Sequence, residues 1–352
     1  MPLSPFTLDV ALLQKAWGGS RLSSLYGDSR DRLGEAWLCA DLAATAASGA
    51  GGQPMISAVS PAPPSRRASR ELPGDAASGS VSIPAGPADL HAALEQDPIG
   101  LLGFHAERFP LLVKLLDSSE HLSVQVHPSP AYARAHPDAH VKSEAWVVLE
   151  SEPSAELMLG VQGVPDAAAL ADAASDGSLP DRLVRFPATP GSACWLPSGL
   201  VHALGAGAVV FEVQTASDTT YRLHDWTERY GRAPREMHLT AGVEAALLGA
   251  EPVWGHAVDP SGSGPILSTP DFDLGVVSGP SSGAIDRPLA SCDAARCLLI
   301  MPVGAAVVLE GGWGRLEAPA HQVTIVPAAA VAGGQLHLLA RARVFVVRVL
   351  GC

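Results

Sequence analysis

The chain has 352 residues, with 36 Asp and Glu against 23 Lys and Arg, so its formal net charge at pH 7 is −13. It contains no run of basic residues, which argues against a general affinity for nucleic acid or anionic lipid; an anionic ligand must be held by a few local cations. The length suits two domains, and no stretch reaches the roughly 18 apolar residues of a membrane span.

The five cysteines are scattered along the chain and lack the C-x-x-C spacing of a zinc ribbon. Reduced thiols in a cytosolic protein are the simplest account of them. The N-terminus also lacks the basic segment and apolar stretch of a secretory signal. We therefore expect a cytoplasmic protein, a monomer or weak homodimer, that binds neither nucleic acid nor membranes.

Short β-type runs dominate the first two thirds of the chain, and clusters of Gly, Pro, Ser and Asp separate them. Short runs separated by turn-forming residues are typical of an all-β sandwich or barrel. The predicted strands are residues 111–116, 122–126, 145–149, 157–161, 193–196 and 208–214. Helices are predicted at 87–102, 165–183 and 233–250. Residues 46–82, rich in Ala, Gly, Ser and Pro, are predicted to form a flexible insertion.

A second series of β-type runs follows, at residues 297–303, 305–309, 321–326 and 344–350. It predicts a C-terminal β-domain over 241–352, after a catalytic domain over 1–240. The C-terminal part contains His321 and His337 but no H-x-H with a matched Glu. We therefore expect this second β-domain to be free of metal.

The segment Leu-Ser-Val-Gln-Val-His-Pro at 122–128 is the most informative stretch of the sequence. On a strand, Gln125 and His127 point to one face while the valines between and before them point to the other. Glu144 and His202 from other strands would complete a compact N/O shell, which suits zinc or another borderline divalent ion. His136 and His140 have i,i+4 spacing, but Pro137 and the loop composition make a second metal pair unfavourable.

Gly191, Pro197, Gly199 and His202 fall as G-x5-P-x-G-x2-H, which resembles the second signature of the cupin superfamily, with Ala206 in place of its usual Asn. In cupins a tight turn aims this histidine into a jelly-roll barrel. The first cupin signature normally supplies H-x-H and a nearby Glu, whereas here Gln125 stands in the first position. The resemblance implies a cupin jelly roll with helical insertions and a C-terminal cupin-like β-domain.

Glutamine in that position resembles the type I mannose-6-phosphate isomerases, which are zinc-dependent cupins, in their short bacterial form. Other ordered blocks between residues 8 and 240 resemble the same family. They are Trp17-Gly18-Gly19, Gly34-Glu35-Ala36-Trp37, residues 109–116, Lys142-Ser143-Glu144-Ala145-Trp146, and Ser217-Asp218-Thr219-Thr220-Tyr221-Arg222 with Asp225-Trp226. The resemblance implies one Zn²⁺ per chain, held by Gln125, His127, Glu144 and His202.

The resemblance also implies an aldose–ketose isomerase acting on a small-molecule sugar phosphate. Moving a proton between C1 and C2 requires an acid or base near the metal. Lys142, two residues from Glu144, would face the same cavity, and Glu212 is a charge among apolar residues; both stay candidates for the proton carrier. Arg222 is implied at the rim of the active site, where it would grip sugar or phosphate oxygens. Lys114 and Ser123 are implied as phosphate contacts.

Three alternatives stay open at this point. They are a metal-dependent cupin acting on another sugar, an iron cupin oxygenase, and a non-catalytic sugar-binding cupin. Oxygenases usually present more histidines, so Gln125 disfavours them. A binding protein needs no proton carrier, so Lys142 and Glu212 disfavour that alternative.

Overall fold

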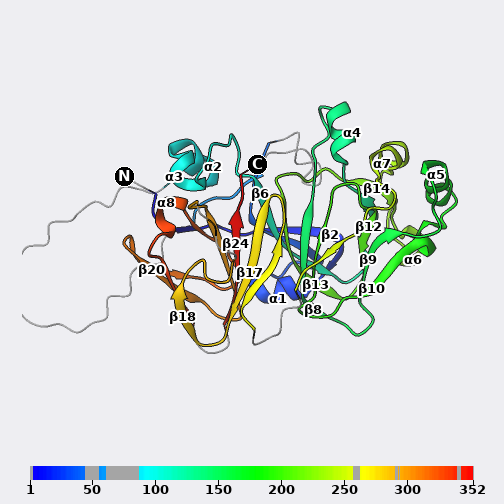
Figure 1. Cartoon of the computed structure of the whole chain (residues 1–352). Coiled ribbons are helices and arrows are strands. Elements are labelled where there is room, and N and C mark those ends of the chain that lie inside the picture. The colour runs from blue at the N-terminus through cyan, green and yellow to red at the C-terminus, as the bar shows by residue number, and fades with distance from the viewer. Residues whose placement is uncertain are drawn as a thin grey trace, which may run out of the picture.

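The computed structural model describes residues 3–43, 55–60, 87–256, 262–289, 292, 294–338 and 342–351. Strands dominate these residues and stack in successive sheets across the molecule (Figure 1). The mainly β fold predicted from the alternating short runs is confirmed. None of the helices in the described ranges is long and apolar enough to cross a membrane.

Two antiparallel sheets form the N-terminal half of the molecule. The seven-stranded sheet has the order β15 (Val253–Trp254), β11 (Ala193–Leu196), β8 (Glu144–Ser151), β13 (Ala208–Thr215), β6 (Leu111–Ser118), β2 (Ala11–Gly19) and β3 (Leu33–Cys39). The five-stranded sheet has the order β10 (Leu183–Pro187), β9 (Glu156–Val161), β12 (His202–Leu204), β7 (Val124–Val126) and β14 (Tyr221–His224). Buried side chains such as Leu116, Trp146 and Leu157 pack between the two sheets.

Two further antiparallel sheets form the C-terminal half. The larger has the order β1 (Phe6–Thr7), β22 (Thr324–Val326), β19 (Leu298–Val303), β24 (Arg343–Val349), β17 (Phe272–Ser278) and β16 (Gly264–Ser268). The smaller has the order β18 (Ser281–Ala284), β23 (Gln335–Leu338), β20 (Val307–Gly311) and β21 (Gly314–Ala318). Val277, Ile300 and Leu336 belong to the core between them.

The two halves share one large core rather than meeting through a polar linker. Phe211 of β13 stacks on Phe345 of β24 with ring centroids 5.1 Å apart. The first strand, β1, pairs with β22, so residues at the start of the chain complete the C-terminal sheet. The two sandwiches are therefore joined both by packing and by an exchanged strand, and β15, which follows the predicted division after residue 240, still belongs to the seven-stranded N-terminal sheet.

Short helices cover the edges of this stack. They are α1 (Arg21–Tyr26), α2 (Leu90–Gln96), α3 (Pro98–Leu102), α4 (Pro130–Ala135), α5 (Ala167–Ser175), the 3-10 helix η3 (Leu179–Arg182), α6 (Thr227–Tyr230), α7 (Leu239–Ala245) and α8 (Ala328–Val331). Leu170 of α5 and Ala245 of α7 pack against Val124 and Val126, on the outer face of the five-stranded sheet.

All three predicted helices are shorter than expected. The helix predicted at 87–102 is broken at Asp97, which precedes Pro98, is extended (φ −159°) and caps α3 by accepting from the Gly100 N–H. The one predicted at 165–183 ends before Gly177, whose φ is +81°. From the one predicted at 233–250 only α7 forms, and the residues from Pro234 to His238 that precede it have no regular secondary structure.

The predicted insertion at 46–82 lies largely outside the described residues. Its described part, 55–60, is regular: β5 (Met55–Ile56) pairs with β4 (Asp41–Leu42), and Val59 bridges Leu8. Ser57 is buried and its Oγ accepts the Ala40 N–H. Residues 55–60 are thus anchored to β4 and to the segment around Leu8.

Candidate metal centre and active site

A tight turn before β12 positions His202. Gly199 in this turn has φ of +94°, which favours glycine, and a Cβ atom there would lie 2.7 Å from Cγ of Leu247, which would have to shift. The Gly199 N–H donates to the carbonyl of His127 at 3.0 Å. The turn therefore holds the backbone of His127 and also positions His202 at the start of β12.

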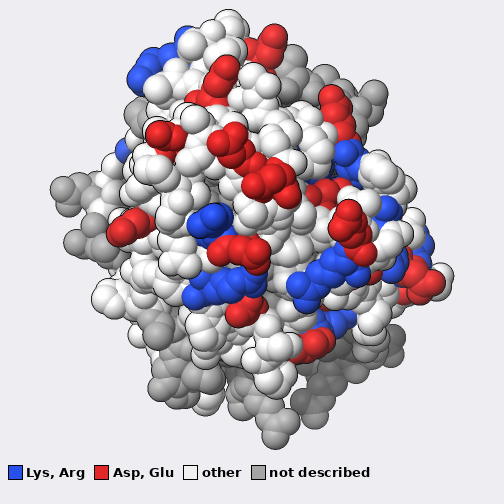
Figure 2. Space-filling model, turned by 90° about the vertical axis from the view of Figure 1, so that its right-hand side faces the viewer, with Lys and Arg blue, Asp and Glu red and all other residues white. Residues whose placement is uncertain are grey.

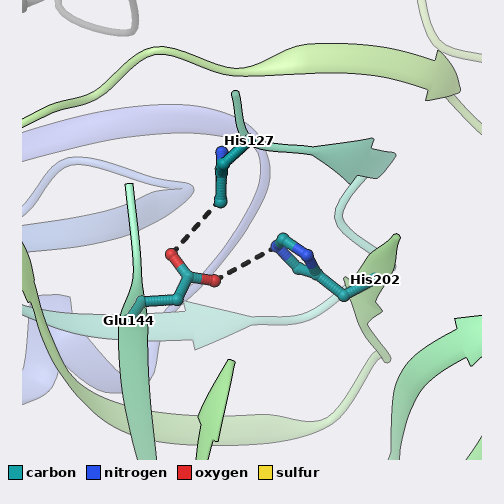
Figure 3. Close-up of side chains that lie close together, drawn as sticks. All are labelled: His127, Glu144 and His202. Atoms are coloured by element: carbon teal, nitrogen blue, oxygen red, sulfur yellow. Dashed lines mark ion pairs between the residues drawn. The ribbon is translucent and has the colours of Figure 1, made fainter. Parts of the chain in front are cut away.

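The carboxylate of Glu144 lies between the rings of His127 and His202 (Figure 3). Its Oε2 is 3.4 Å from Nε2 of His127, and its Oε1 is 3.1 Å from Nε2 of His202. The three candidate ligand atoms all lie within 4.8 Å of one another, and the three residues are buried. In the described part of the chain, no other group of three His, Cys, Asp or Glu residues is close enough to hold a metal.

Both imidazole rings are oriented by hydrogen bonds on their far side. Nδ1 of His127 donates to the carbonyl of Thr219 at 2.9 Å, and Nδ1 of His202 donates to the carbonyl of Leu200 at 2.8 Å. These bonds place the free lone pair of each ring on Nε2, which faces Glu144. Burial, and then the charge of Lys142, lower the pKa of His127 to about 3, so its ring is neutral at pH 7, as a metal ligand must be.

The Glu144 carboxylate is fully buried, and neither of its oxygens accepts a well-directed hydrogen bond from a described residue. Burial raises its pKa, but Lys142 and then His127 outweigh this effect and hold that pKa well below its ordinary value. A buried, charged carboxylate with unused acceptor sites fits a cation better than it fits a closed protein network.

Gln125 lies on β7 between His202 and Arg222, because its backbone pairs with β12 on one side and β14 on the other. Residues directly opposite one another share a face of the sheet, so all three side chains point inward. The Gln125 Nε2 is 3.2 Å from Nε2 of His202, while its Oε1 accepts from Ser123 Oγ at 3.3 Å. A half turn about the terminal side-chain bond would bring the amide oxygen into the ligand position.

Lys142 contacts both Glu144 and His127. Its Nζ is 2.8 Å from Oε2 of Glu144 and 3.1 Å from Nε2 of His127, and the side chain is 4% exposed. A bound metal would use the same atoms of Glu144 and His127. Because Nε2 of His127 has one lone pair, it can bind either this ammonium group or a metal, so Lys142 would give up this contact to a bound metal.

A row of alternating aromatic and charged residues crosses the seven-stranded sheet beside this group. Lys114 Nζ lies 4.6 Å from the ring centre of Trp37 and 3.7 Å from Glu212 Oε2, and Trp146 Nε1 donates to Glu212 Oε1 at 3.0 Å. Lys114 also pairs with Asp218 at 2.9 Å. Because Lys114 is 2% exposed and has two carboxylate partners, its charge is already compensated.

Glu212 has a strongly altered acidity. Burial, and then the charge of Glu144, raise its pKa to about 7, although Lys114 opposes the shift. A carboxyl group with this pKa can gain or lose a proton near neutral pH. Glu212 therefore stays a candidate for the proton carrier beside Lys142.

Nearly all of the predicted site residues meet around one cavity of about 210 Å³. Six of them line it: Lys114, Ser123, Gln125, Lys142, Glu212 and Arg222. The other three, His127, Glu144 and His202, lie behind this wall, where they contact Lys142 or Gln125. Residues to which the sequence reasoning gave no role also line it: Lys15, Trp17, Glu35, Asp218 and Arg235. Trp17, Glu35 and Asp218 occur in the blocks that carried the family resemblance; Arg235 had no such signal.

In the described part of the chain, His136 and His140 belong to no group of three residues that could hold a metal. The ring of His136 stacks on Tyr132 at 3.8 Å, and its Nδ1 donates to the Tyr132 carbonyl. His121 contacts Tyr230, and His238 accepts the backbone N–H of Arg222 at 3.1 Å. These histidines serve local packing and hydrogen bonding.

No family model matches the chain. It is 38% identical over 140 residues to "Mannose-6-phosphate isomerase ManA" of Bacillus subtilis (strain 168), a match covering 39% of this chain and 44% of that protein. It is 31% identical over 252 residues to "Probable mannose-6-phosphate isomerase GmuF" of the same organism, covering 69% of each chain. The chain thus spans about half the length of the first of these relatives and over two thirds of the second.

Solved structures match the fold over nearly the whole chain. The mannose 6-phosphate isomerase of Bacillus subtilis superposes with a TM-score of 0.71 at 23% identity, covering 98% of this chain and 99% of that one. The Salmonella typhimurium enzyme bound to fructose 6-phosphate and zinc superposes with a TM-score of 0.64 at 14% identity, covering 98% and 99%. At these identities the likeness supports the fold.

Proposed function

Since the chain belongs to the mannose-6-phosphate isomerase family, we propose that it interconverts mannose 6-phosphate and fructose 6-phosphate in a zinc-dependent reaction. The observation that carries the proposal is the placement of Glu144 between His127 and His202, with Lys142 2.8 Å from the carboxylate and the sugar-sized cavity beside them. Gln125 would complete the ligand set as the fourth residue.

The chemistry requires a proton to move between C1 and C2 of the open-chain sugar. A bound zinc would polarise the neighbouring sugar oxygens and stabilise the negative charge that develops on them. Lys142 and Glu212 line the cavity and are the groups that would hold and move the proton. Burial raises the pKa of Glu212, which suits a carboxyl group that accepts and returns a proton.

Arg222 would orient the substrate rather than transfer the proton. Its backbone pairs with Gln125, and its Nη1 donates to the Glu236 carbonyl at 2.6 Å, which fixes the guanidinium at the cavity wall. Its Nε is buried and has no hydrogen-bond partner among the described residues. Ser123 lies nearby with its hydroxyl on the Gln125 amide. Both would donate to oxygens of the sugar phosphate.

The remaining parts of the proposal concern the state of the protein in the cell. We propose that it works in the cytoplasm as a monomer or weak homodimer, with the C-terminal β-domain, 241–352, acting as a metal-free scaffold. The buried free thiols of Cys39, Cys194 and Cys297 suit a reducing compartment. A net charge of −13 does not favour binding to nucleic acid or anionic membranes.

A turnover assay with mannose 6-phosphate tests the function directly. Fructose 6-phosphate formation is followed in a coupled assay with purified protein, before and after treatment with EDTA and after addition of Zn²⁺. We expect activity that disappears with EDTA and returns with zinc. Undiminished activity in the metal-free protein would exclude the proposed role of the metal centre, and no turnover by the zinc-loaded protein would exclude the isomerase.

A further inference from the structure

Residues 216–220, called the crossing loop below, connect β13 to β14 and so pass from the seven-stranded sheet to the five-stranded sheet. The loop contacts two groups of the active site. Its Thr219 carbonyl accepts from Nδ1 of His127 at 2.9 Å, and its Asp218 carboxylate accepts from Nζ of Lys114 at 2.9 Å. Residues 217–220 have no regular secondary structure, so the pairing of strands within either sheet does not hold them in place.

Gln214, near the end of β13, anchors this loop to the strand that precedes it. The side chain is fully buried, and its Nε2 donates to the carbonyl of Ser217 and, at 3.3 Å, to that of Thr215. The Ser217 hydroxyl in turn accepts the backbone N–H of Thr219 at 3.2 Å. A continuous series of hydrogen bonds therefore runs from the Gln214 amide through Ser217 and Thr219 to the ring of His127.

The amide of Gln214 contributes little net stability. Its orientation is set by the two carbonyl groups, because the reverse orientation would place the amide oxygen against them. In the observed orientation Oε1 is buried and has no hydrogen-bond partner among the described residues, which costs free energy. A methionine would fill a similar volume without this cost. The contribution of the amide therefore lies in where it holds the Ser217 carbonyl.

The affinity of the centre for a metal depends on the orientation of its buried ligands rather than on a surface field. On the face shown in Figure 2, which carries α5 and α6, the Lys and Arg side chains of the described residues stand beside Asp and Glu, so this face has mixed charge. His127, Glu144 and His202 are buried. A hydrogen bond to the far nitrogen of a ligand imidazole fixes the direction of the near one. Displacement of the Thr219 carbonyl would therefore release the ring of His127.

We propose that Gln214 is a positioning residue for the metal centre, which holds the crossing loop so that the Thr219 carbonyl orients the ring of His127. This inference rests on the proposed binding of zinc and extends it to a residue outside the ligand set. Gln214 acts through Ser217 and Thr219 and does not itself bind the metal. Loss of such an outer hydrogen-bonding partner typically lowers metal affinity about 10- to 100-fold.

The first test measures the zinc affinity of the purified metal-free protein by competition with a chromogenic chelator. Gln214→Met should bind zinc about 10- to 100-fold more weakly than the wild type. Its thermal midpoint without metal should change by less than about 4 °C, because the variant exchanges one unsatisfied acceptor for another. Zinc affinity equal to that of the wild type would overturn the inference.

Gln14→Met is the matched control for this substitution. It removes a bond of 2.8 Å from Nε2 of Gln14 to the carbonyl of Asp31, at an exposed position of β2. This variant loses the same chemical group away from the metal centre and should bind zinc as the wild type does. An equal loss of zinc affinity in both variants would contradict a specific role of Gln214.

A second test shows whether Gln214 acts through His127. In a His127→Gln background the ring is absent, so the addition of Gln214→Met should weaken zinc binding by less than about twofold further. A full second loss of about 10- to 100-fold would mean that Gln214 supports the structure in general, and would overturn the inference.

Ser217→Ala removes the next bond in the same series and covers the case in which Gln214→Met folds poorly. It should weaken zinc binding to a similar extent, and wild-type affinity in this variant would contradict the proposed route to His127. The zinc titrations need no substrate. Their outcome is therefore independent of whether the protein turns over mannose 6-phosphate, and a failure of the isomerase proposal is distinguishable from a failure of this one.

Discussion

Glu144 is the single carboxylate among the four side chains at the candidate metal centre, since the other three are two imidazoles and an amide. Its carboxylate also has unused acceptor sites in a fully buried position. The metal therefore depends on this residue for charge as well as for geometry. The same residue compensates Lys142, which links the metal centre to one of the proton-carrier candidates.

Glu144→Gln keeps the size of the side chain and removes its charge. We expect zinc affinity to fall by more than about 100-fold, beyond the 10- to 100-fold typical of losing a supporting group. Metal analysis after dialysis measures the effect. Glu150→Gln, at an exposed position on the same strand, is the matched control and should retain the metal. A zinc content equal to that of the wild type in Glu144→Gln would contradict the assigned ligand set.

His121 gives the protein a defined sensitivity to acid. Burial, and then Arg229, lower its pKa from 6.5 to about 4, so the folded protein binds this proton less readily than the unfolded chain. The stabilising contribution is complete above about pH 6.5 and is lost as the pH falls toward about 4. His121→Asn should therefore lose less stability than the wild type between about pH 7 and about pH 4.5.

Urea midpoints of the metal-free proteins at several pH values measure this difference without interference from zinc release. His136→Asn is the control, because His136 is exposed on the surface beyond α4. A wild-type dependence on pH in His121→Asn would show that other groups cause the acid sensitivity.

At the level of elements, the turn before β12 places His202 and depends on one glycine. Gly199→Ala would strain a backbone with φ of +94° and push Cβ to 2.7 Å from Leu247 Cγ. We expect a loss of about 1–3 kcal/mol in stability together with a loss of zinc, because the turn also holds the backbone of His127. Denaturation and metal analysis measure the two effects.

Gly177→Ala supplies the matched control for this turn. Gly177 has φ of +81°, but a Cβ atom there would meet nothing within 4 Å. The backbone strain is similar while the steric clash and the link to the metal centre are missing. Gly177→Ala should be destabilised by about 1 kcal/mol and keep its zinc; equal zinc loss in both variants would contradict the role given to the Gly199 turn.

The elements also show what a single sequence can and cannot predict. The alternation of polar and apolar residues around Gln125 predicts a strand with one polar face. The valines of β7 indeed pack on the opposite face, against α5 and α7. Composition predicts a helix over 233–250, but it does not register that Glu236 and His238 hydrogen-bond with Arg222 of β14. Arg235 reaches the cavity through this tertiary contact, and for that reason no sequence pattern marks it.

At the scale of the whole molecule, the stacking of the two sandwiches buries one face of the seven-stranded sheet in the shared core, while the opposite face of that sheet lines the cavity. Phe211 lies on β13 next to Glu212, so the same strand presents a core residue to one side and a cavity residue to the other. Rigid packing behind the sheet therefore supports the geometry in front of it. Sequence alone predicts two β-domains but gives no measure of how closely they pack.

Phe345→Ala tests this coupling, because it removes the partner of Phe211 from the C-terminal side. We expect the free energy of unfolding to fall by about 3–5 kcal/mol, as for other fully buried phenylalanines. Since the two halves share a core, calorimetry should still show one cooperative transition for both, and zinc should raise its midpoint as a whole. Phe186→Ala, which removes a half-buried ring that contacts Trp254, should cost less. Two separate transitions, of which zinc shifts only one, would mean that the C-terminal sandwich folds independently of the active site.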